Sequence, residues 1–185
     1  MKLLDPRGFG LVCATGAVAI GLTVAGCANR VEGVANPNAS DLAAYKTEAA
    51  SSSAAATSSR RAAAQSKAIA DNCGQFPTIS GLGVSKYNEF VDAHDANAPD
   101  YLAKRDLAVS TLEDAANKVE SSVRTARDAL PPDLAAQFTE YVNAARALAA
   151  ETRTMTYTAP VGALNDASKR VNDARNVVRD ACPRR

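Results

Sequence analysis

A sustained heptad spacing of apolar residues in the C-terminal half is the feature that most constrains the fold. From Val109 onward these residues are separated alternately by three and four positions, which keeps them on one face of a helix. Arg105 interrupts the pattern, and we expect its long stem to lie across the edge of the core. The spacing predicts a helix over residues 99–130. Its buried stripe is Leu102, Val109, Leu112, Ala116, Val119, Val123, Ala126 and Leu130.

Two further segments repeat the pattern and are separated by proline-marked turns. Pro131-Pro132 ends the first helix, and Pro132-Asp133 begins the second. A third follows a break at residues 158–160. Long helices joined by short turns pack antiparallel, so the predicted fold class is an all-α antiparallel bundle. The predicted stripes are Leu134, Phe138, Tyr141, Ala145, Leu148, Thr152 and Met155, and then Val161, Leu164, Ser168, Val171, Ala174, Val178 and Ala181.

Composition agrees with close-packed helices. The chain has 40 alanines in 185 residues, only 5% aromatic residues and no tryptophan. A β-sandwich or barrel would need more β-branched and aromatic residues. With 21 basic and 20 acidic side chains, the chain has no global field that would attract nucleic acid.

The segment before the heptads has a weaker helical pattern. Residues 41–72 are rich in Ala and Ser, and residues 51–59 hold six Ser or Thr without a charge. Ser40-Asp41 is a plausible N-cap, so we expect a long Ala/Ser helix, with a flexible stalk as the alternative. A short helix is expected at residues 85–96, with Tyr87, Phe90 and Val91 on one side.

The N-terminus has the features of a secretory signal peptide. Lys2 and Arg7 precede 17 uncharged residues that end at Ala25. The stretch is short and rich in glycine for an uncleaved membrane anchor. An ordinary signal peptide, cut elsewhere, is the other alternative.

The sequence Val24-Ala25-Gly26-Cys27 resembles the bacterial lipobox, and it stands directly after the apolar stretch. The resemblance implies diacylglyceryl transfer to the Cys27 sulfur and cleavage between Gly26 and Cys27. It divides the chain into a lipoprotein signal peptide (1–26), a lipid-anchored tether (27–40) and a helical domain (41–185). The mature chain would be exported and anchored on the extracytoplasmic side of the cell membrane.

The remaining cysteines form an even pair. Cys73 and Cys182 are 109 residues apart, and a disulfide is the default interpretation in an exported chain. No Cys-x-x-Cys motif supports a redox role. If five helices alternate in direction, the first and last finish at the same end, which brings the two cysteines together. That end would point away from the membrane.

Little in the sequence suggests catalysis. His94 lies near Asp92, Asp95 and Asp100, but it is the chain's single histidine and the spacing does not match an EF-hand loop. We expect a solvated helix end there. Gly81-Leu82-Gly83 is too short to cradle a phosphate and would ease the backbone between two helices. We therefore predict no catalytic residue, cofactor or metal site.

Two residue sets have both a structural and a functional interpretation. The basic residues Lys169, Arg170, Arg175 and Arg179 alternate with aspartates, so they form a solvated face or bind an anionic envelope polymer or protein. The aromatic side chains cap an Ala-rich core or line an apolar ligand groove. That set is Tyr87, Phe90, Tyr101, Phe138, Tyr141 and Tyr157.

As a whole the chain resembles the small, Ala-rich exported lipoproteins of actinobacteria, of the mycobacterial type. The resemblance rests on the lipobox, the Ala/Ser stretch and the pair Cys73 and Cys182. It implies a cell-envelope location and no particular activity. We expect a membrane-anchored structural or partner-binding module and not an enzyme. The alternatives are a carrier that holds an apolar ligand between helices and an enzyme centred on His94.

Overall fold

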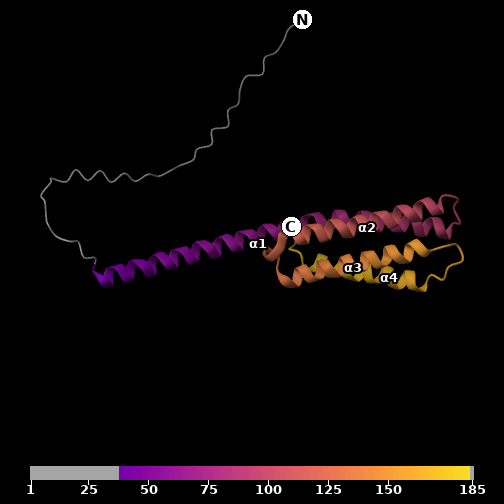
Figure 1. Ribbon diagram of the computed structural model, residues 1–185. Helices are drawn as coiled ribbons and strands as arrows, with labels where there is room; N and C mark the ends of the chain where they lie inside the picture. Colours follow the sequence, from indigo (N-terminus) through magenta and orange to yellow (C-terminus); the bar gives the residue numbers. More distant parts are fainter. Residues whose placement is uncertain (1–37, 184–185) are drawn as a thin grey trace, which may run out of the picture. The chain divides into compact units, whose positions relative to one another are not determined.

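A computed structural model describes residues 38–183 (Figure 1). The predicted signal peptide, the cleavage and lipidation sites (Gly26, Cys27) and residues 27–37 of the predicted tether lie outside the described part, whereas Ala39 and Ser40 of that tether are helical. The chain divides between Leu42 and Ala43 into two compact units. Within residues 38–183 there is no strand. The predicted all-α antiparallel bundle is confirmed. Its elements are α1 (Ala39–Asp95), α2 (Tyr101–Ala126), the short 3₁₀ helix η1 (Arg127–Ala129), α3 (Pro132–Thr154) and α4 (Gly162–Ala181).

The bundle consists of α2, α3, α4 and the second half of α1. Alanines fill much of the core, and their small side chains allow helix axes to approach closely. The large buried side chains occupy the space that remains. Fully buried positions include Phe90, Tyr101, Ala108, Leu112, Ala116, Phe138, Tyr141, Ala145, Ala149, Ala167, Val171 and Val178.

The predicted break between residues 72 and 85 is wrong, because α1 continues through this segment as one helix. Gly83 is buried, and a Cβ atom there would lie 3.4 Å from Leu112 Cδ2. The glycine therefore allows close packing of α1 on α2 and does not make a turn. The helix also continues through Pro77.

The continuity of α1 changes the topology that helix counting predicted. Four helices alternate in direction where five were expected, so α4 ends where the packed half of α1 begins. Cys73 and Cys182 still meet, because Cys73 lies one turn after Ala68, the first buried residue of α1. The disulfide is thus at the end of the bundle where α1 enters it. Five alternating helices would have placed it at the opposite end of the bundle, and that prediction is wrong.

The first half of α1 buries no side chain in the described structure. Every residue from 43 to 67 is exposed. Several hydroxyl groups donate to carbonyls of the same helix, as Thr57 does to Ser53 at 2.9 Å. The helix predicted for residues 41–72 is present, but its N-cap is Asn38 and not Ser40. The Asn38 side-chain oxygen accepts the backbone N–H of Ser40 at 3.2 Å.

The heptad stripes mostly face the core, with instructive exceptions. Leu102 is 57% exposed, whereas its neighbour Tyr101 is 1% exposed and packs its ring 4.4 Å from that of Tyr157. Leu130 is buried although α2 ends before it, because η1 returns the chain to the core. Val161 is also exposed. As expected, Arg105 lies at the core edge, where it donates to the Met155 carbonyl at 3.3 Å.

Ion pairs on α2 connect helices. Glu120 pairs with Arg146 of α3 at 2.9 Å, and Glu113 pairs with Arg153 of α3 at 2.6 Å. The hydrogen bond from Arg146 lowers the pKa of the Glu120 carboxyl. Both ion pairs therefore link α2 to α3.

Candidate functional site

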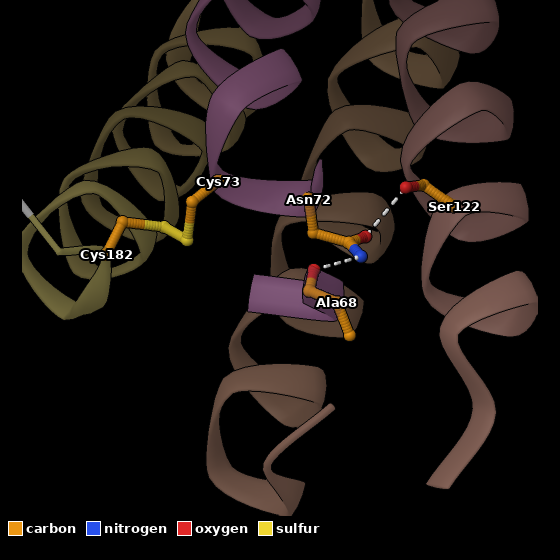
Figure 2. Close-up of a disulfide and its surroundings, with 5 residues drawn as sticks. All are labelled: Ala68, Asn72, Cys73, Ser122 and Cys182. Atoms are coloured by element: carbon orange, nitrogen blue, oxygen red, sulfur yellow. Dashed lines mark hydrogen bonds between the residues drawn. A yellow bond between two sulfur atoms is a disulfide. The ribbon is translucent and has the colours of Figure 1, made fainter. Parts of the chain in front are cut away.

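The disulfide joins the packed half of α1 to the end of α4. The Cα atoms of Cys73 and Cys182 are 5.6 Å apart, and both residues are partly buried against the core (Figure 2). Pro77 has no N–H to donate to the carbonyl of Cys73, four residues earlier. The disulfide therefore fixes α1 at a turn that lacks one backbone hydrogen bond.

An apolar hollow of about 540 Å³ lies beside this bond, between α1 and the end of α4. We call it the disulfide groove. Its walls are mostly carbon and sulfur, with one charged side chain. The residues are Ser66, Ile69, Ala70, Cys73, Gly74, Phe76 and Pro77 of α1, with Arg179, Cys182 and Pro183.

Phe76 connects the groove to the core. It is 3% exposed, and its ring makes edge contacts with Phe138 at 5.4 Å and with Tyr141 at 4.8 Å. This part of the groove is therefore rigid. Phe76 is not in the predicted aromatic set, because it lies between the two helices predicted at residues 41–72 and 85–96.

Arg179 is the charged residue of the groove. Its Nε atom lies 3.5 Å from Asp180 Oδ1, and the two side chains are 65% and 72% exposed. Such an exposed, long ion pair is weak. The guanidinium is thus free to interact with an anion beside the groove.

A polar hollow of about 760 Å³ lies between α1 and α2. At its edge, the side chain of Asn72 donates to the Ala68 carbonyl at 2.9 Å and accepts from Ser122 at 2.7 Å. Figure 2 shows this pair and the disulfide on different sides of α1. Both positively and negatively charged side chains line the hollow, among them Lys67, Asp71 and Lys118. Its charge therefore favours neither anionic nor cationic ligands.

A sequence model of the family described as the Rv2240c four-helix bundle domain matches residues 55–183. The chain belongs to this family. No curated protein and no solved structure matches the chain. The family match covers the disulfide and both hollows, together with part of the exposed half of α1.

The structure separates the acidic residues that surround His94. Asp95 Oδ1 lies 3.2 Å from His94 Nδ1, whereas Asp100 pairs with Lys104 at 3.2 Å. The Nε2 atom of His94 is buried without a partner, beside the rings of Tyr101 and Tyr157. Within residues 38–183 no cluster of three acidic, histidine or cysteine side chains could hold a metal ion. The histidine therefore belongs mainly to an aromatic cluster at the turn.

The predicted aromatic residues are mostly core residues. Phe90, Tyr101, Phe138 and Tyr141 are each no more than 1% exposed. Burial raises the pKa of Tyr141 to about 12, although Arg175 opposes the shift. Burial also raises the pKa of the Tyr101 hydroxyl. These rings cap the Ala-rich core, and the groove is formed by other residues.

Two of the four basic residues of α4, Lys169 and Arg179, pair with aspartates of the same helix. Lys169 pairs with Asp173 at 2.5 Å on the solvent side of the helix. Arg175 donates to the Ser80 hydroxyl of α1 at 3.3 Å.

Gly81-Leu82-Gly83 is helical and forms no loop. Across residues 38–183, no helix has the length and hydropathy needed to span a bilayer.

Proposed function

We propose that this chain is an exported, lipid-anchored envelope protein whose four-helix bundle acts as a structural or partner-binding module. The anchor would be a diacylglyceryl group on Cys27. The sequence Val24-Ala25-Gly26-Cys27 supports this proposal, since it follows a basic start and an apolar stretch. Two acyl chains hold a protein firmly on a membrane, whereas one chain is marginal.

The observation that carries the proposal is the contrast within α1. Residues 43–67 are helical and all exposed, while the same helix is packed from Ala68 onward. At 1.5 Å per residue, a helix of this length spans about 37 Å. A segment of that kind suits a spacer between an anchor and a folded domain.

The charge of the proposed mature chain supports an anchor over electrostatic attraction. Removal of residues 1–26 takes away Lys2, Asp5 and Arg7, which leaves 19 basic and 19 acidic side chains. A neutral chain gains little from anionic lipid surfaces. Membrane retention would then depend on the acyl chains.

Intact mass spectrometry of the protein extracted from membranes tests this proposal. We expect a mass that begins at Cys27 and includes acyl chains, with an increase of two hydrogens on reduction of the Cys73–Cys182 bond. The substitution Cys27→Ser should leave an unacylated, unprocessed chain. Cys13→Ser, in the apolar stretch that precedes the lipobox, is the matched control and should change neither processing nor acylation. An unacylated native mass would refute the anchor.

A further inference from the structure

The disulfide groove has the size and lining of a site for an alkyl chain. Its volume of about 540 Å³ is within the range of small-molecule sites. Ile69, Ala70 and Pro77 offer carbon surface, and the disulfide adds polarizable sulfur. Each methylene buried against such a surface raises affinity about fourfold. An unbranched chain therefore gains more here than a compact polar ligand does.

Charge selects among molecules that carry an alkyl chain. Among the residues between 38 and 183 that line the groove, Arg179 alone is charged, and its only carboxylate neighbour in that part of the chain is Asp180, at 3.5 Å in a weak, exposed pair. Arg179 lines the groove from the last turn of α4, three residues before Cys182. A cationic head group would be repelled there, whereas a carboxylate could accept its hydrogen bonds.

We propose that the disulfide groove binds the alkyl chain of a single-chain anionic amphiphile of the fatty acid class, with its carboxylate at Arg179. This inference goes beyond the membrane anchor and does not depend on it. The polar hollow on the other side of α1 is unsuited to this ligand, because Asp71 and the side chains of Asn72 and Ser122 lie in it.

Photolabelling of the full chain with a sixteen-carbon fatty acid bearing a terminal diazirine tests the site directly. After reduction and trypsin digestion, the groove residues fall mainly in peptides 68–86 and 180–184. We expect saturable labelling of these peptides, and unlabelled palmitate should compete. Octanoate should compete far less, since it buries fewer methylenes. Labelling spread over the chain without saturation would overturn the proposal.

Two matched alanine substitutions locate the binding. Ala70 lines the groove and is exposed, so Ala70→Phe fills the groove without entering the core. We expect it to reduce labelling of peptide 68–86 at least about tenfold, the loss of two buried methylenes or more. Ala62→Phe, in the exposed part of α1, should leave labelling within about twofold, as expected for a surface change. Equal labelling of the two variants would place the ligand elsewhere and overturn the site.

Arg179→Gln tests the charge class. Arg179 also lies in the last turn of α4, where a cation offsets the helix dipole. If it binds the carboxylate, the variant should need about two- to fivefold more palmitate for half-maximal competition, as for an exposed ion pair. Competition by hexadecanol should not change. Arg170→Gln, on the same helix but outside the groove, is the control. An equal effect of Arg179→Gln on both competitors would overturn the anionic class.

Discussion

The two halves of α1 share one helix axis but have different reasons to be helical. In residues 43–67 no side chain is buried, so the helix depends on alanine propensity and on extension from the packed half. In the second half, buried side chains run from Ala68 to Ala93, and contacts of Asn72, Phe76 and Ser80 reach α2, α3 and α4 respectively. A continuous helix is therefore not uniformly stable along its length, because tertiary packing supplies most helix stability in water.

Removal of the disulfide should give the largest difference between the two halves, because Cys73 lies in the packed half. The double substitution Cys73→Ala/Cys182→Ala removes a link that closes a loop of about 110 residues, and we expect about 4 kcal/mol less unfolding free energy. Chemical denaturation followed by tyrosine fluorescence measures this loss. Helicity of residues 43–67 should not change. A loss below about 1 kcal/mol would mean that packing alone holds α4 on α1.

The same substitution, to proline, compares the stability of the two halves of α1. Asn88 and Ala55 are both exposed on α1, in the packed and the unpacked half respectively. Asn88→Pro should destabilise the bundle by about 3 kcal/mol, because it removes a hydrogen bond and clashes with the preceding turn. Ala55→Pro should lower the helical circular dichroism signal but leave the Tm unchanged. A matching drop in Tm would show that residues 43–67 are packed in solution.

Alkaline unfolding distinguishes a buried from an exposed tyrosine. The pKa of Tyr141 is raised to about 12, so its neutral form is favoured in the folded state. This contribution is fully present below pH 10, the unfolded value, and is lost as the pH rises to about 12. The loss amounts to about 2–3 kcal/mol.

Stability measured from pH 9 to 12 checks this prediction. Tyr141→Phe should flatten the curve by that amount. Tyr45→Phe is the control, because Tyr45 is 70% exposed on the unpacked half of α1. If the two variants followed the same curve, Tyr141 would not be the buried group that titrates.

The glycines of α1 should give the smallest effects, with opposite signs. A Cβ at position 81 meets nothing within 4 Å, so Gly81→Ala should stabilise the helix by about 0.5–1 kcal/mol. Gly83→Val should destabilise by about 1–2 kcal/mol, because its methyl groups would overlap Leu112 and Ala115. Thermal denaturation of both variants checks the signs. Stabilisation by Gly83→Val would contradict the close packing of α1 on α2.

Much of the fold follows from apolar spacing, but the packed half of α1 does not. Its buried stripe has nearly the same spacing as the other helices. Three of its members are Asn72, Ser80 and Gly83, which carry no apolar signal. Asn72 is buried because Ser122 and the Ala68 carbonyl satisfy its side chain, and Gly83 because α2 is close. Such partners are properties of the tertiary structure and cannot be found from one helix's sequence.

The candidate site was predictable only in part. The pair Cys73 and Cys182 follows from cysteine counting, and the structure joins them. The groove beside them requires Phe76 and Pro77 to be helical, whereas the sequence suggested a connection there. The exposure of Leu102 at the start of α2 was also not predictable from its spacing. The ring of Tyr101 fills the space that the heptad pattern assigned to Leu102.

Amide hydrogen exchange of the full chain, resolved by peptide mass spectrometry, tests the central contrast most directly. We predict two classes of protection within α1. Amides of residues 43–67 should exchange quickly and fastest toward the N-terminal end, while those near Phe90 should exchange only with global unfolding. The boundary should lie near Ala68, the first buried residue. Uniform, strong protection from residue 43 to residue 95 would contradict the account, since it would show that the exposed half is packed.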